Sequence, residues 1–191
     1  PAVFEYSTVR DFEGTLVAAP YPALIVNDQA SGSSQHLSLV GVGKHGFGES
    51  LASFSGKQVR LRAKRIYRDE GLMLEVMPGS ITPMVAKASS SHIVPVSSGS
   101  IQLTGEIVDT KCFLGVMNPG RSKIHRDCAA RCISGGVPPA LLVAERSHLY
   151  LLAGADGSPL HPRTILDRVA EPVIVRGELW KLGDSYSIYV S

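Results

Sequence analysis

Short apolar runs separated by turn sequences dominate this chain. Residues 59–63 alternate apolar and basic side chains, which is the period of two shown by a half-buried strand. Residues 23–26 and 140–144 are continuous apolar runs of strand length. Residues 69–71 (Asp-Glu-Gly) and 183–184 (Gly-Asp) are typical of turns, and 12 prolines and 19 glycines interrupt the remaining runs. The pattern therefore predicts an all-β protein.

The apolar runs form two similar sets. Three segments match later ones in the same order: 22–26 with 139–143, 59–63 with 173–177, and 72–76 with 186–190. The first match spans 117 positions and the other two span 114, whereas the opening strands at 14–17 and 105–108 are only 91 apart. The second set therefore carries about 26 additional residues, at roughly 112–137. Function is often added to a scaffold in such insertions, and we expect a short linker replacing residues 113–136 to leave the second unit folded.

Each set reads as three strands, a short helical stretch and a final hairpin. The first set places its elements at 14–17, 23–26, 36–42, 48–54 (helical), 59–63 and 72–76. This order is typical of an OB-like barrel, and a generic small β-barrel or sandwich is the rival architecture. We predict tandem OB-like barrels at residues 1–85 and 101–191, joined by a serine-rich linker at 86–100.

Composition and charge argue against a nucleic-acid-binding protein and against a membrane-spanning one. The chain has 191 residues, of which 44% are hydrophobic and 19% charged, so it can fold around apolar cores. The net charge is +2, and the basic run at 57–68 has only one neighbouring aromatic, Tyr67, so we expect no nucleic acid partner. No apolar run is long enough to span a bilayer. The chain begins at Pro1 rather than methionine, as expected after removal of an N-terminal signal or anchor.

The only three cysteines lie close together with one histidine. Cys112, His125, Cys128 and Cys132 have the spacing C-x12-H-x2-C-x3-C. Residues 126–133 favour a helix, which the glycines and prolines of 135–139 end. On that helix the last three of these side chains share one face, and we place Cys112 at the end of the preceding strand. The four can therefore surround one point.

Three interpretations of this cluster remain open. A Cys3His site suits tetrahedral zinc, and the same ligands could hold iron or an iron–sulfur cluster. A disulfide from Cys112 to Cys128 or Cys132 would leave one free thiol, because two cysteines four apart on a helix pair poorly. The cysteines could also be small buried apolar residues with no ligand. The other histidines are scattered and form no second ligand motif.

The segment carrying this cluster resembles a family motif. Residues 105–112 (Gly-Glu-Ile-Val-Asp-Thr-Lys-Cys) and 125–136 resemble G-E-[IV]-V-D-x2-C followed by H-x2-C-A-x2-C-I-x-G-G. That motif is found in a poorly characterised group of bacterial exported proteins with small OB-like domains. The resemblance covers the second unit, and it implies a periplasmic or otherwise extracytoplasmic protein, often membrane-associated. An oxidising compartment would favour a disulfide over a metal.

These observations lead to two functional hypotheses. The first is an accessory subunit whose Cys3His centre holds a structural zinc ion, or iron or an iron–sulfur cluster for electron transfer within a membrane redox assembly. Its partner would be a membrane protein or redox complex. The alternative is a metal-free interaction module with a disulfide-stapled loop. A closed site with four ligands leaves no position for substrate, so we expect no catalytic residue.

Overall fold

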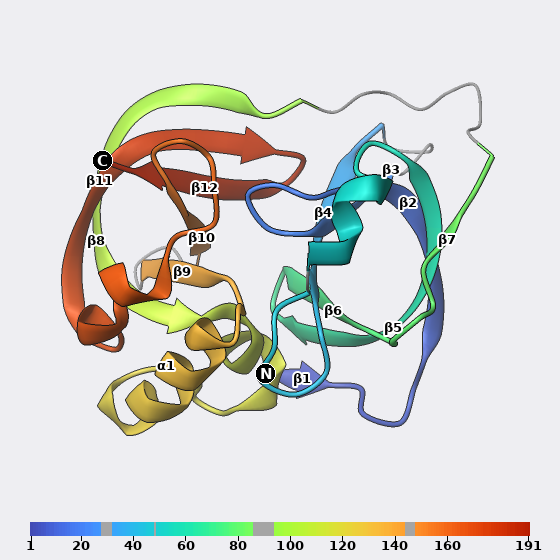
Figure 1. Ribbon diagram of the computed structural model, residues 1–191. Coiled ribbons are helices and arrows are strands. Elements are labelled where there is room, and N and C mark those ends of the chain that lie inside the picture. Colours follow the sequence, from blue (N-terminus) through green and yellow to red (C-terminus); the bar gives the residue numbers. More distant parts are fainter. Residues whose placement is uncertain (28–31, 48, 86–93, 144–147) are drawn as a thin grey trace.

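A computed structural model describes residues 1–27, 32–47, 49–85, 94–143 and 148–191. The chain is mostly β and forms two closed five-stranded barrels side by side (Figure 1). The first barrel consists of β2 (Arg10–Val17), β3 (Ala23–Asn27), β4 (Ser34–Val40), β5 (Gln58–Arg68) and β6 (Gly71–Val76). The second consists of β8 (Val96–Asp109), β9 (Pro139–Val143), β10 (His148–Gly154), β11 (Pro172–Leu182) and β12 (Ser185–Val190).

The two barrels have the same strand pairing. In the first, β2, β3 and β4 form an antiparallel meander, β4 pairs parallel with β6, and β5 closes the ring between β6 and β2. The second repeats each pairing with β8, β9, β10, β12 and β11. This agreement confirms the prediction of a β-barrel protein.

Each barrel has its own apolar core. Leu16 of β2, Leu24 of β3 and Leu61 of β5 are fully buried in the first. The alternation along β2 and β5 accounts for Leu16 and Leu61. Leu141 and Ile188 occupy the corresponding core of the second. Short elements complete the barrels: η1 (Glu49–Phe54), η5 (Pro162–Thr164), η6 (Leu166–Arg168), β1 (Val3–Phe4) and β7 (Thr82–Pro83).

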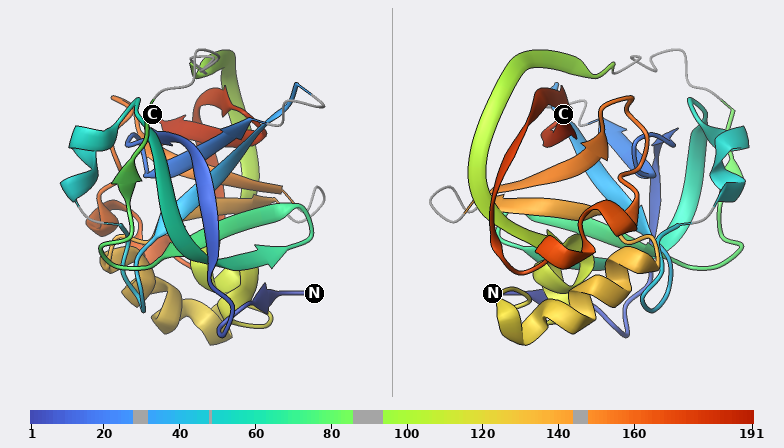
Figure 2. Two further views of the ribbon diagram at one scale, coloured as in Figure 1. Left: turned by 90° about the vertical axis from the view of Figure 1, so that its right-hand side faces the viewer. Right: turned by 60° about the vertical axis from the view of Figure 1, so that its left-hand side comes forward.

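The connection between β8 and β9 distinguishes the two barrels. In the first barrel residues 18–22 join the equivalent strands, whereas residues 110–138 do so in the second. This connection contains η2 (Cys112–Val116), η3 (Lys123–His125) and α1 (Arg126–Ser134), at one end of the molecule (Figure 2). The helix at 126–133 is confirmed. Cys112, however, lies in η2 and not at the strand end, because β8 stops at Asp109.

The connection is also packed into the protein. Ala129 and Ile133 of α1 are 2% exposed and belong to the core of the second barrel. Phe113 and Leu114 of η2 join a third apolar cluster that includes Ile66 of the first barrel. This packing argues against the expectation that the second unit folds without residues 113–136.

The linker region differs in part from the sequence-based expectation. Residues 86–93 lie outside the described part of the chain. Residues 96–100 were expected in the linker, but they form the first part of β8 and pair with β11.

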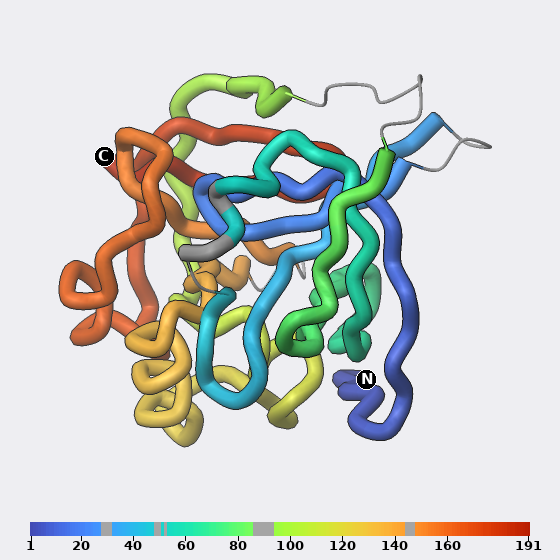
Figure 3. Tube along the Cα trace, turned by 45° about the vertical axis from the view of Figure 1, so that its right-hand side comes forward, coloured from blue at the N-terminus to red at the C-terminus, as the bar shows by residue number. Residues whose placement is uncertain are grey.

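Buried polar contacts hold the two barrels together. The Tyr21 hydroxyl, from the β2–β3 connection, donates to the Leu152 carbonyl at 2.7 Å and accepts from the Leu160 N–H at 3.0 Å. Burial raises the pKa of Tyr21 to about 12. Residues 41–47, which follow β4, lie beside α1 (Figure 3), and the Gly46 N–H donates to the Gly135 carbonyl at 2.9 Å. The barrels therefore share a specific interface.

Candidate metal centre

Local hydrogen bonds fix where the first cysteine lies. Asp109, fully buried at the end of β8, accepts the Cys112 N–H through Oδ1 at 2.8 Å and so begins the turn of η2. Thr110 Oγ1 donates to the Pro138 carbonyl at 2.9 Å, which closes the base of the connection. The two ends of the connection are thereby held together, and Cys112 lies close to the end of α1.

The helix α1 supplies the other two cysteines. Its buried face packs Ala129 and Ile133 into the second barrel, and Cys132 lies beside them at 1% exposure. Cys128, one turn earlier, is partly exposed. The helix ends at Ser134, where the Gly135 N–H donates back to the carbonyls of the last turn. Both thiols therefore point to the side of α1 that faces η2.

The three sulfurs form a compact triangle. Cys112 Sγ lies 3.9 Å from Cys128 Sγ and 3.8 Å from Cys132 Sγ, and all three sulfurs are within 4.8 Å of one another. A disulfide needs about 2.05 Å, and the cysteines are free thiols in this structure. Sulfurs at about 2.3 Å from a tetrahedral ion are separated by about 3.8 Å, from the geometry of the tetrahedron. The two separations from Cys112 therefore match the edge of such a site.

His125 is placed next to this triangle and is held by Asp109. It is 4% exposed, and its Nε2 lies 3.1 Å from Asp109 Oδ2. Asp109, Cys112 and His125 form a second group of ligand atoms within 4.8 Å of one another. Within the described residues, no group at that distance contains His125 together with all three thiols. The structure thus brings three predicted ligands together and leaves the imidazole at their edge.

Cys112 and Cys132 have pKa values shifted in opposite directions. The hydrogen bond with Cys132, followed by burial, raises the pKa of the Cys112 thiol far above its usual range. The same hydrogen bond lowers the pKa of Cys132, with a smaller contribution from the positive charge of Lys44. The proton shared between these two sulfurs is therefore held more strongly by Cys112 than by Cys132. A cation at the centre of the triangle would replace that proton.

Two lysines connect the centre to the first barrel. Lys44 Nζ donates to Cys128 Sγ at 2.9 Å, and this bond raises the pKa of the lysine. Lys111, 3% exposed, donates to the carbonyls of Gly41 and Gly43 at 2.7 and 2.6 Å. Its third bond, to Glu75 Oε2, is 2.7 Å. The loop that follows β4 thus presents two backbone carbonyls to the ammonium group of Lys111.

Sequence reasoning missed Asp109, Lys44 and Lys111 as parts of this site. Asp109 and Lys111 stand within three residues of Cys112, inside the motif that carries the resemblance, so their position was a usable signal. Lys44 lies in the other barrel, and no local pattern connects it with Cys128.

Of the other basic residues, Arg60 of the 57–68 run pairs with Glu13 across β2 and β5.

Comparisons with protein-family models, curated proteins and solved structures find no match to this chain. Among the described residues, no helix has the length and apolar character required to cross a membrane.

Proposed function

We propose that Cys112, Cys128 and Cys132 bind one metal ion, zinc in the first instance, with His125 as the fourth ligand. The sulfur separations of 3.8 and 3.9 Å carry this proposal, because they equal the edge of a tetrahedral thiolate site. Three thiolates brought together by separate backbone elements are what a structural zinc ion stabilises.

The partner of His125 supports its role. Histidines that bind metals usually donate their second ring N–H to a carboxylate, which fixes the ring and raises its basicity. The Nε2–Asp109 contact at 3.1 Å supplies such a carboxylate. When Nε2 donates to Asp109, the lone pair of the imidazole is on Nδ1, which becomes the ligand atom. The ring would have to move toward Cys128 and Cys132 to complete the site, because His125 is grouped with Cys112 but not with the other two thiols.

The proposed role of the ion is to join η2, α1 and the first barrel. Three thiolates around a divalent cation leave one net negative charge, and Lys44 supplies a positive charge at Cys128. We assign both barrels to the OB-like class on their strand order. An extracytoplasmic accessory subunit of a membrane assembly fits the motif resemblance. If the ion is iron, or an iron–sulfur cluster, the same ligands would serve electron transfer.

Metal content of the natively purified protein tests the proposal. We expect about one equivalent of zinc and a colourless protein; iron would give a coloured one. Replacement by Co²⁺ should produce the intense visible bands of tetrahedral cobalt bound to thiolates. Each of Cys112→Ser, Cys128→Ser and Cys132→Ser should release the ion, and His125→Ala should weaken its binding. Asp127→Asn, an exposed carboxylate on the same helix, is the matched control and should retain the metal.

The disulfide alternative predicts different results. Cys112 is in van der Waals contact with both other sulfurs, so a rotamer change could bring either one to bonding distance. Protein of that kind would contain no metal and one titratable thiol, and His125→Ala would have almost no effect. Metal-free native protein with one free thiol would refute the metal proposal.

A further inference from the structure

A cleft lies between the two barrels, and residues of η2 form part of its lining. Its volume is about 500 Å³, within the usual range of roughly 300–1,000 Å³ for small-molecule sites. The first barrel lines it with the beginning of β4 and the β5–β6 turn, and the second with β10 and the β11–β12 turn. Thr110, Phe113 and Leu114 of the β8–β9 connection also line it.

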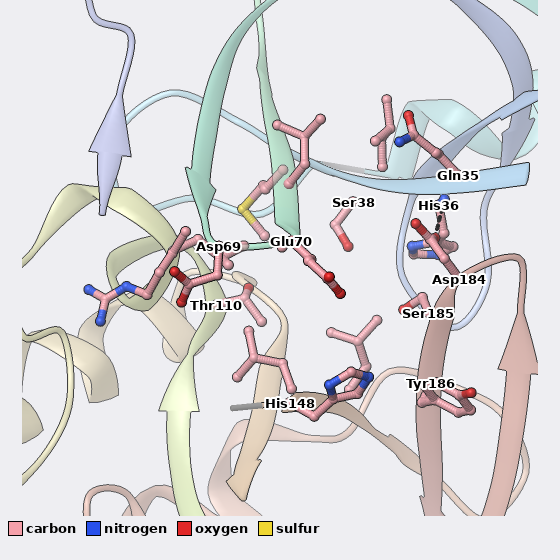
Figure 4. A pocket seen from close by; sticks show the side chains of 18 of the residues that line it. Gln35, His36, Ser38, Asp69, Glu70, Thr110, His148, Asp184, Ser185 and Tyr186 are labelled. Carbon is pink, nitrogen blue, oxygen red and sulfur yellow. Dashed lines mark hydrogen bonds between the residues drawn. The ribbon is translucent and has the colours of Figure 1, made fainter. Parts of the chain in front are cut away.

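Equivalent turns of the two barrels meet across this cleft. In the β5–β6 hairpin Arg68 pairs with Gly71, and in the β11–β12 hairpin Leu182 pairs with Ser185. The residue before the closing strand is therefore Glu70 in one turn and Asp184 in the other, so the repeat places a carboxylate on each wall. In Figure 4 the Glu70 side chain extends into the space, with Asp184 on the opposite side.

The cleft combines an apolar floor with an acidic rim. Phe113, Leu114 and Leu151 are at most 8% exposed and form part of the floor. Asp69, Glu70 and Asp184 are exposed at the rim.

The positively charged and titratable lining groups do not neutralise this rim. The guanidinium of Arg68 lies over the Phe113 ring at 4.4 Å and donates to the Met117 carbonyl at 3.2 Å. Burial lowers the pKa of His36 to about 4, which leaves that ring neutral near pH 7. The described lining therefore presents net negative charge above an apolar surface.

Aromatic rings add a further feature that suits a cation. His148 and Tyr186, both lining the cleft, have ring centroids 5.9 Å apart, and Tyr150 lies 5.9 Å from Tyr186. The faces of tyrosine rings attract ammonium groups, and the Lys181 ammonium already lies 5.5 Å from the Tyr186 centroid. This wall therefore accommodates a cation, and the carboxylates are the groups left to bind the ammonium of a ligand.

We propose that this cleft binds a small organic cation with an apolar body, such as an aryl- or alkylamine. The ammonium group would lie between Glu70 and Asp184, and the apolar body would cover Phe113 and Leu114. This site is separate from the metal centre and does not depend on the metal proposal.

Three probes that share one apolar body test this proposal. 4-Phenylbutylamine, 4-phenylbutanol and 4-phenylbutyrate would each be titrated into the ¹⁵N-labelled full chain and followed by amide chemical shifts. We expect the amine to shift Gly71, Leu114 and Leu149 with saturation, the alcohol to bind at least about tenfold more weakly, and the acid not to bind. Raising the salt concentration from about 0.05 to 0.5 M should weaken the binding of the amine, because salt screens the exposed charges.

Variants distinguish the rim from the rest of the surface. The triple variant Asp69→Asn, Glu70→Gln, Asp184→Asn should bind the amine about tenfold or more weakly than the unmodified protein does. Asparagine at position 184 keeps the oxygen that accepts the backbone N–H of His36 at 2.7 Å. Asparagine at position 69 tolerates the positive φ of 52° found there. Asp11→Asn, an exposed acid outside the cleft, is the control and should not change binding. Equal binding of the three probes, preference for the acid, or no binding of the amine would each overturn the proposal.

Discussion

The buried ion pair between Lys111 and Glu75 provides the sharpest test of how the barrels are joined. Lys111→Met leaves an unbranched side chain that is one atom shorter and removes the charge. The carboxylate of Glu75, 4% exposed, then loses its 2.7 Å partner, and the carbonyls of Gly41 and Gly43 lose a donor. We therefore expect unfolding to become easier and the contact between β6 and the β8–β9 connection to loosen.

The magnitude follows from the burial of both groups. Breaking one side of a buried ion pair costs about 3–5 kcal/mol, and each carbonyl left without a partner adds about 1–3 kcal/mol when water cannot reach it. One compensation exists, because Lys64 Nζ lies 4.0 Å from the other oxygen of Glu75. We expect a net loss of at least about 3 kcal/mol in the free energy of unfolding.

Urea denaturation followed by circular dichroism measures this loss, and a second substitution isolates its cause. Lys111→Met combined with Glu75→Met removes both charges, and should recover a large part of the stability because apolar pairs of similar volume often replace buried ion pairs without cost. Arg60→Met, which breaks the exposed pair with Glu13, is the control and should leave the midpoint almost unchanged. If Lys111→Met behaves like Arg60→Met, or if the double variant is no more stable than the single one, the reasoning is wrong.

Four further outcomes are expected. Tyr21→Phe should cost roughly 1–3 kcal/mol, because the buried Leu152 carbonyl and the partly buried Leu160 N–H lose their partner. The pKa of Tyr21 is raised from 10.0 to about 12, so between these pH values the folded protein keeps a proton that the unfolded chain releases. The free energy of unfolding should therefore fall by about 1.4 kcal/mol for each pH unit in that interval. Tyr21→Phe should remove this part of the pH dependence in denaturation curves measured from pH 9 to 12. Gly46→Ala should destabilise the protein in thermal melts, since its Cβ would collide with the Gly136 carbonyl, and an unchanged melting temperature would contradict the observed approach of these loops. Replacing residues 113–136 by a short glycine linker should broaden or abolish cooperative unfolding, and a protein that melts like the full chain would show that α1 contributes little to the core.

Much of the barrel architecture could be predicted from the sequence because it depends on local patterns. The period of two in residues 59–63 reports which side of β5 is buried, and the turn at 69–71 connects β5 to β6 as expected. The helix of the β8–β9 connection was also predictable, since glycine and proline follow it at 135–139. The order of the strands in the repeat was enough to indicate two similar barrels.

The sequence also indicated the thiols but not their full surroundings. Spacing on one helix face brings Cys128 and Cys132 together, and a strand-to-helix return brings Cys112 near them. The same spacing placed His125 with the thiols, whereas the structure holds its ring against Asp109. A side chain's choice between neighbouring partners depends on angles that linear spacing does not specify.

The sequence by itself therefore determined the strands and the clustering of the three cysteines, because each depends on residues close together in the chain. It also determined the repeat, because the same local patterns recur in the same order. Only the tertiary structure decided that Lys44 meets Cys128, that Lys111 reaches Glu75, and that Glu70 and Asp184 face one another across a cleft. These contacts join residues of different barrels. Their geometry depends on how two closed surfaces pack together, and no periodicity along either half of the chain encodes it.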